Sequence, residues 1–218
     1  RSTPKPSSAA SDVYKRQGYD TSCAILDNST QAVCWGQRSD WSDSGGTTRS
    51  GELLLGSSSP SNSGTVVDLD TTGDRIYSIT MGESHACAIV ENTVECWGVE
   101  ESGSFGQGSS TTAAYSTPQT ISVPSGLTAK QIVIEHSTDS TSGVFEDADG
   151  ASSVICWGAE TTVGYSASSP ITTLADSPVQ NSNGDEITPS DDSLSPYDIV
   201  YLQSGEAHTC ALSRQGLI

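Results

Sequence analysis

A short cysteine hairpin recurs along this sequence, and its spacing limits the folds that the chain can adopt. In each complete copy two cysteines flank an apolar stretch, and Trp-Gly follows the second cysteine directly. The residues are Cys23, Cys34, Trp35 and Gly36 in the first copy, Cys87, Cys96, Trp97 and Gly98 in the second, and Cys156, Trp157 and Gly158 in the third. The cysteine before Trp recurs after 62 and then 60 residues, and a fourth copy begins at His208-Thr-Cys210. This internal repeat predicts a fold built from equivalent structural units.

The length and content of each repeat favour an all-β architecture. A period near 60 residues is too long for a leucine-rich or tetratricopeptide solenoid, and it suits a four-stranded β-propeller blade. Each copy has an apolar strand that leads to a glycine, then the cysteine hairpin, a Gly- and Ser-rich loop and a Pro-containing extended segment. β-branched alternation bounded by Gly, Pro, Asn and Asp marks the strands, and no window supports an amphipathic helix.

The cysteines of the second hairpin can be set opposite each other. With Cys87 opposite Cys96, Glu91-Asn92 becomes a two-residue turn, in which Asn tolerates the positive φ that such turns need. Opposed residues have Cβ atoms about 4.5–5.5 Å apart, within reach of a disulfide that adds about 2–3 kcal/mol. The predicted structural disulfides are Cys23–Cys34 and Cys87–Cys96. The alternative is reduced, buried cysteines in a cytosolic protein, whereas disulfides favour an oxidising compartment and hence export.

The third copy departs from this pattern. Aligning residues 142–145 with 87–90 replaces the first cysteine by Ser142, and a longer turn follows. Cys156 then has no hairpin partner, and Cys210 has none within this sequence. Six cysteines therefore do not imply three bridges.

No group of residues has the spacing of a metal or catalytic site. His85 and His208 each precede a cysteine by two residues, but Thr21 holds that position in the first copy, and structural zinc needs four converging ligands. The acidic segments 147–150 and 181–186 lack the spacing of a calcium loop and suit tight turns instead. Since no nucleophile–base set or phosphate loop is found, we predict no catalytic residue, no metal and no cofactor, and hence not an enzyme.

The Trp after each second cysteine is predicted to be a core residue. It occupies one repeat position beside a glycine, where an aromatic ring can wedge between stacked sheets. The predicted repeat core is Trp35, Trp97, Trp157, Gly36, Gly98 and Gly158. Trp41 lies outside the repeat and is a candidate surface aromatic.

Charge divides the chain into two parts. Residues 1–17 are basic, share no pattern with the repeats and resemble a translated linker, so we exclude them from the fold; a native disordered arm is the alternative. Residues 18–218 hold 26 of the 27 acidic residues and 5 of the 9 basic ones. Such a surface repels phosphate backbones, so we expect no binding of nucleic acid; it suits solubility or a cationic partner. No stretch of 18 apolar residues exists and no apolar leader stands near the start, so we expect no membrane insertion.

These parts, in this order, resemble the regulator of chromosome condensation repeat family. The segment Gly82-Glu-Ser-His-Ala-Cys-Ala-Ile-Val and the later Cys96-Trp-Gly, with Leu-Gly or Phe-Gly turns and a Pro-rich return strand, are similar to the repeat of its secreted prokaryotic branch. The resemblance covers residues 18–218, as three units and the start of a fourth. It implies a seven-bladed β-propeller, of which this chain would form about half.

The resemblance also implies a choice of functions. Eukaryotic members include a nucleotide-exchange factor for a small GTPase bound to chromatin, and prokaryotic members include a protein inhibitor of β-lactamases. Neither role transfers residue by residue, because the binding loops are individual here. We expect a non-catalytic scaffold, extracellular or on the cell surface, that recognises a protein or glycan through its loops. The alternatives are a propeller domain of a larger surface enzyme or adhesin, and an exchange factor for a small GTPase.

Overall fold

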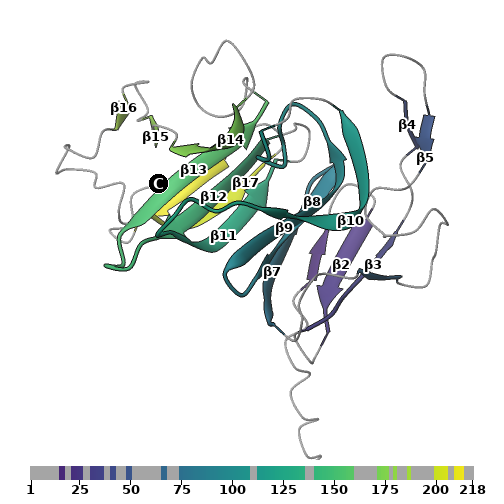
Figure 1. Ribbon diagram of the computed structural model, residues 1–218, viewed down its shortest axis with the longest axis horizontal. Helices are drawn as coiled ribbons and strands as arrows, with labels where there is room; N and C mark the ends of the chain where they lie inside the picture. Colours follow the sequence, from purple (N-terminus) through teal and green to yellow (C-terminus); the bar gives the residue numbers. More distant parts are fainter. Residues whose placement is uncertain are drawn as a thin grey trace, which may run out of the picture.

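The described residues form strands and turns, and none of them lies in a helix. The computed structural model describes residues 15–17, 21–26, 30–36, 40–42, 48–50, 65–67, 74–108, 112–135, 140–159, 171–176, 179–180, 186–187, 199–205 and 209–213. Within these segments no helix is long and apolar enough to cross a membrane. Figure 1 shows the strands gathered into twisted sheets that stand side by side.

Three four-stranded antiparallel sheets follow one another along the chain, and each forms one blade (Figure 1). Blade 1 consists of β1 (Lys15–Gln17), β2 (Thr21–Ile25), β3 (Ala32–Gly36) and β6 (Thr65–Val67). Blade 2 consists of β7 (Ile76–Met81), β8 (His85–Val90), β9 (Thr93–Glu100) and β10 (Ala113–Ile121). Blade 3 consists of β11 (Thr128–Ile134), β12 (Ser140–Glu146), β13 (Ser152–Gly158) and β14 (Ile171–Asp176).

The remaining strands form two-stranded sheets. Blade 4 consists of β17 (Ile199–Ser204) paired with β18 (Thr209–Ser213), and β17 packs against β11, β12 and β13 of blade 3. The other pairs are β4 (Asp40–Ser42) with β5 (Thr48–Ser50), and β15 (Val179–Gln180) with β16 (Glu186–Ile187). Each blade therefore begins with an edge strand, β1, β7, β11 or β17, that pairs with the first strand of the hairpin. These four strands pack against one another from blade to blade, and we call them the innermost strands.

The register predicted for the second hairpin is confirmed. Cys87 lies opposite Cys96, and residues 91–92 form the turn between β8 and β9. The positive φ of this turn falls on Glu91, at 48°, although we expected Asn92 to supply it. The N–H of Glu91 donates to the Arg75 carbonyl at 3.0 Å, so the turn is also tied to the strand that precedes the hairpin.

Both predicted cysteine pairs lie at disulfide-bonding distance, and we call them the first staple (Cys23–Cys34) and the second staple (Cys87–Cys96). Their S–S distances are 1.96 Å and 2.09 Å. All four cysteines are buried. Each staple joins the two strands of a hairpin directly across the ladder, where opposed side chains are closest.

In blade 3 a hydrogen bond takes the place of the disulfide. Ser142 lies opposite Cys156, as the alignment of the third repeat predicts, and its Oγ donates to Cys156 Sγ at 3.2 Å. Gly143 follows where Ala88 stands in blade 2. A Cβ on Gly143 would lie 2.7 Å from a ring carbon of Phe145, so the glycine makes room for this larger side chain.

The hydrophobic core is divided into layers between successive blades. The first staple shares a core with Trp97 of blade 2, and the second staple shares a core with Trp157 of blade 3. Both Trp side chains are fully buried, whereas Trp35 is half-buried. Gly98 and Gly158, which follow these two Trp residues, have φ of 107° and 108°, a backbone conformation that favours glycine. The Trp of one blade thus packs with the staple of the blade before it.

The first described residues belong to the segment that we expected to lie outside the fold. Lys15–Gln17 pair with β2 in the position that β7 holds in blade 2. Lys15 and Gln17 therefore stand where Ile79 and Met81 are buried in the next repeat. Residues 1–14 lie outside the described part of the chain, so the boundary after Gln17 stays a prediction.

Candidate functional site

A buried polar network joins blades 2 and 3. His85 of β8 is 0% exposed, and its Nε2 lies 3.0 Å from Thr141 Oγ1 of β12. The Thr141 hydroxyl donates to the Ser104 carbonyl at 3.1 Å, and Trp157 Nε1 donates to the same carbonyl at 2.8 Å. Because a hydroxyl has only one proton to donate, Thr141 accepts from His85, which assigns the proton of the neutral ring to Nε2.

The surroundings of His85 favour its neutral form. Burial lowers the pKa of His85 to about 4. The ring of Phe105 lies beside it, with centroids 5.9 Å apart. Among the described residues no group of His, Cys, Asp and Glu is arranged to hold a metal ion. His85 therefore ties two blades together from the start of its strand, while His136 and His208 lie outside the described residues.

A different set of contacts joins blades 3 and 4. The Gln131 side chain makes two hydrogen bonds to the backbone of Leu202, donating to its carbonyl at 2.8 Å and accepting from its N–H at 2.7 Å. Two further bonds run from Ser204 Oγ to the Ile134 carbonyl at 2.8 Å, and between Thr209 Oγ1 and Glu135 Oε1 at 3.1 Å. The innermost strands β11 and β17 are therefore joined by side chains that satisfy backbone groups.

One buried carboxylate stands apart from both networks. Glu100, at the end of β9, is buried, and its Oε1 has no hydrogen-bond partner. Burial raises the pKa of Glu100, against a smaller opposite effect of a hydrogen bond with Tyr115. A single carboxylate supplies too few ligands for a metal site.

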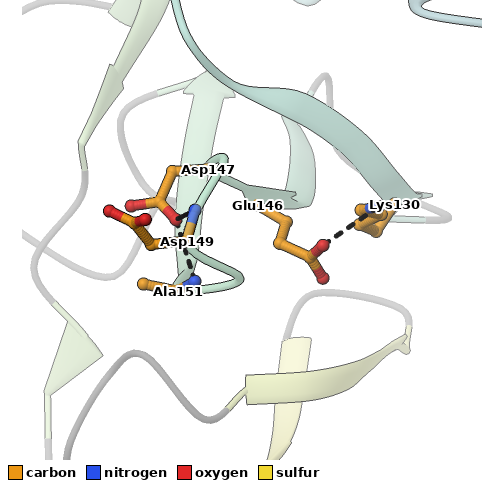
Figure 2. Close-up of polar contacts among 5 residues, drawn as sticks. All are labelled: Lys130, Glu146, Asp147, Asp149 and Ala151. Carbon is orange, nitrogen blue, oxygen red and sulfur yellow. Dashed lines mark hydrogen bonds and ion pairs between the residues drawn. The ribbon is translucent and has the colours of Figure 1, made fainter.

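The tip of the blade 3 hairpin is a turn closed by its own aspartate (Figure 2). Asp147 Oδ1 accepts hydrogen bonds from the N–H groups of Asp149 and Ala151, both at 2.9 Å. Gly150, with φ of 84°, donates to the Asp147 carbonyl at 3.1 Å. This acidic segment therefore forms a tight turn in which Asp147 Oδ1 satisfies two backbone N–H groups. Of the other acidic segment, only Glu186 lies among the described residues.

Three innermost strands carry a β-bulge at the same place. The ladder shifts between Ile76 and Ser78 in β7, between Ala129 and Gln131 in β11, and between Ile199 and Tyr201 in β17. The extra residues are Tyr77, Lys130 and Val200, and all three are exposed. A bulge re-aims a side chain without ending the strand. We call the surface formed by these three residues and Tyr201 the bulge rim.

Two bulge residues contact a carboxylate at one equivalent hairpin position. A hydrogen bond with Glu91, and next the charge of this carboxylate, raise the pKa of Tyr77. The Arg75 guanidinium lies over the Tyr77 ring, 5.5 Å from its centroid. In blade 3, Lys130 Nζ lies 3.2 Å from Glu146 Oε1 (Figure 2). The same backbone position therefore presents a different side chain in each blade.

The sequence contained a signal for the bulge rim that we did not use. Tyr77 and Val200 each stand ten residues before the first hairpin cysteine of their repeat. Lys130 stands twelve residues before Ser142, because the loop in between is longer in blade 3. Aligning the repeats on the hairpin would have placed the three residues at equivalent positions. Only the strand pairing in the structure shows that they are bulged and exposed.

The sheet arrangement matches solved β-propellers of the regulator of chromosome condensation type. The crystal structure of human WBSCR16 aligns with a TM-score of 0.66 at 15% identity, over 93% of this chain and 45% of that one. Prp20p of Saccharomyces cerevisiae, studied for its binding to Gsp1p and histones, aligns with a TM-score of 0.58 at 14% identity, over 93% and 42%. Yeast RCC1 (Prp20), solved with Kap60 bound to it, aligns with a TM-score of 0.51 at 16% identity, over 94% and 43%. No protein-family model and no curated protein matches the sequence.

The chain therefore has the fold of a β-propeller with blades of this type, and the fold class predicted from the repeat is confirmed. It spans less than half of the length of each of these solved structures. At this level of identity the likeness establishes the fold, and activity has to be argued from the residues themselves.

Proposed function

We propose that this chain is a non-catalytic binding scaffold, secreted or on a cell surface, that recognises a protein or a glycan through the exposed parts of its blades. The observation that carries this proposal is that the interior residues of the blades repeat, whereas the exposed residues differ from blade to blade. Inside, the blades repeat the hairpin, the staple position and the Trp. Outside, the bulge position shows Tyr77, Lys130 and Val200 in three successive blades. A rigid repeat with individual surface residues is the arrangement expected of a recognition surface.

Two further observations support the proposal. Prp20p, which shares the fold, was studied for its binding to proteins, so a propeller of this kind can serve as a protein-binding surface. The staples support an oxidising compartment, because disulfides are rare where thiols are kept reduced.

The binding test presents the purified, oxidised chain to a panel of glycans and of purified proteins and measures association by interferometry. We expect saturable binding to a member of one class, with the ligand recovered chemically unchanged. The control is the same chain after reduction and heating, which should lose the binding. Turnover of a panel compound, or a panel in which the folded and heated chains behave alike, would contradict the scaffold function.

The compartment is tested by alkylating the thiols without reductant and weighing the product. We expect labels on Cys156 and Cys210 alone, and labels on all six cysteines only after reduction and unfolding. Alkylation of the staple cysteines in chain isolated directly from its native host would contradict an oxidising location.

The exchange-factor alternative gives a separate measurement. A nucleotide-exchange factor speeds the release of a fluorescent guanine nucleotide from its GTPase. We expect this chain to leave the release rate of a small GTPase unchanged at concentrations where panel binding saturates. A saturable acceleration would replace the scaffold proposal with the exchange-factor one.

A further inference from the structure

The bulge rim collects the exposed apolar side chains of the described residues in one region. The large hydrophobic side chains that are exposed among those residues are Tyr77, Val200 and Tyr201, at 53%, 44% and 42%. Two of them occupy the bulge position and the third follows it directly. Apolar side chains that gather on a surface mark an interaction site, whereas single scattered ones do not.

Packing brings the three bulges to one end of neighbouring blades. Strand β11 packs against β7 on one side and β17 on the other. Each bulge lies near the start of its strand, which is the end where the hairpin turns back. The hydrogen bond from Glu91 to Arg75 and the ion pair between Lys130 and Glu146 hold the hairpins of blades 2 and 3 beside their bulges. The three bulges therefore lie at the same end of three successive blades.

Carboxylates outnumber cations at this end of the blades. The described carboxylates here are Asp74, Glu91, Glu146, Asp147 and Asp149, and the described cations are Arg75 and Lys130. Both cations already have a partner, since Arg75 lies over Tyr77 and Lys130 pairs with Glu146. The rim therefore presents aromatic rings within a surface of net negative charge.

We infer that the bulge rim binds a segment of a partner protein that is rich in arginine or lysine. The inference rests on the proposed function and names the surface and the partner chemistry for it. A guanidinium can lie over an aromatic ring while it pairs with a carboxylate, and Arg75 over Tyr77 shows the first of these two contacts within the chain itself. A polyanion would be repelled by the same surface, and a neutral sugar would gain no attraction from its net negative charge.

The test uses the full chain with its disulfides intact and a fluorescein-labelled peptide of alternating arginine and serine. Binding is followed by fluorescence anisotropy at low ionic strength, beside matched peptides in which glutamate or glycine replaces arginine. We expect saturable binding of the arginine peptide alone. The affinity should fall as salt is added, because the ion pairs at the rim are exposed to solvent.

Four variants separate the rim from the general charge of the chain. Tyr77→Leu and Tyr201→Leu keep an apolar side chain and remove the aromatic face, so each should weaken binding about two- to fivefold. Glu91→Gln should weaken binding about twofold through the loss of one exposed ion pair. Glu83→Gln is the matched control, because it removes the same charge from an exposed residue before the start of β8, at the opposite end of the blade.

Equal weakening by Glu91→Gln and Glu83→Gln, full affinity in both Tyr variants, or no binding of the arginine peptide would each overturn the rim proposal. A panel ligand that binds Tyr77→Leu as tightly as the unchanged chain would also overturn it, while the scaffold function would stand. Catalytic turnover of a panel compound would overturn the scaffold function alone.

Discussion

The seam between blades 2 and 3 and the seam between blades 3 and 4 solve the same packing problem with different chemistry. The first holds the second staple, Trp157 and the network around His85, all within a buried core. The second holds a smaller apolar core, in which half-buried Cys156 takes part without a disulfide. There Gln131 bonds directly to the backbone of the next innermost strand. One seam is therefore stabilised mainly by apolar burial around a covalent bond, and the other by side chains that satisfy backbone groups.

The difference between the two seams shows that the repeat determines which positions face a neighbouring blade, but not which residues interact there. Thr141 and Thr209 occupy the same place in blades 3 and 4, each directly before the staple position. Thr141 bonds to His85 of the preceding blade, whereas Thr209 bonds to Glu135. In these two blades the position that faces the preceding blade thus holds a threonine hydroxyl, and its partner differs between the two seams.

Removing the Trp at the first of these seams should have the largest effect. Trp157→Ala should lower the free energy of unfolding by about 3–5 kcal/mol, because it removes a fully buried ring and leaves a cavity beside the second staple. Trp157→Phe keeps most of the ring and loses the hydrogen bond to Ser104, so it should cost about 1–2 kcal/mol beyond its packing change. Urea unfolding measures both. A loss below about 1 kcal/mol for the alanine variant would show that this ring does not hold the seam.

Acid should weaken the same seam through His85. The pKa of His85 is about 4 in the folded chain and near 6.5 when unfolded, so the unfolded chain binds the extra proton between these values. The contribution is therefore complete above pH 6.5, falls as pH drops toward 4 and changes little below that. The expected loss is about 3 kcal/mol. Unfolding measured from pH 7.5 to 3.5 should show this slope, and His85→Gln, which can still donate to Thr141, should lack it. Parallel curves for the two proteins would contradict the assignment.

A covalent staple can be built into the third blade. Ser142→Cys places a thiol opposite Cys156, where the native side chains are already 3.2 Å apart. The new bond should raise the free energy of unfolding by about 2–3 kcal/mol. Mass measurement after alkylation should show no label on Cys156, and Ser142→Ala serves as the control that leaves its thiol reactive. If the introduced thiol and Cys156 both stay alkylatable in the folded chain, the two positions do not face each other as described.

Substitution at the seam between blades 3 and 4 should change the free energy of unfolding least. Gln131→Leu removes both hydrogen bonds to Leu202 and leaves its backbone groups without these partners, at a cost of about 1–2 kcal/mol. Lys130→Met changes the exposed neighbour on the same strand and should cost less than about 0.5 kcal/mol. Hydrogen exchange localises the effect: the Leu202 amide should exchange faster in Gln131→Leu, while amides of β8 stay protected. Faster exchange throughout blade 2 would mean that the two seams are not separate.

The hairpins could be predicted from the sequence because their interactions are local. The register of Cys87 with Cys96 follows from pairing residues nine apart, and the place of Ser142 follows from aligning one repeat on another. The seams could not be predicted, because their partners are distant along the chain. Ser104 accepts from Trp157, 53 residues away, and Gln131 bonds to Leu202, 71 residues away.

The bulge rim was missed for another physical reason. Alternation of apolar and polar residues predicts which face of a strand is buried, and a bulge breaks that alternation at one residue. Tyr77 in β7 therefore reads as one more strand residue between Ile76 and Ser78. Its exposure comes from the unpaired extra residue in the ladder, which only the structure shows.

The burial of the staples has a consequence for how the chain meets reductants. Thiol–disulfide exchange requires an attacking thiolate to reach a sulfur atom, and all four staple sulfurs belong to cysteines that are 0% exposed. A reductant in solution can act on the second staple only after blade 3, with Trp157, has moved away from it. The rate at which excess thiol reduces each staple therefore reports how often the neighbouring blade separates from it. The first and second staples report this rate at two separate places along the propeller.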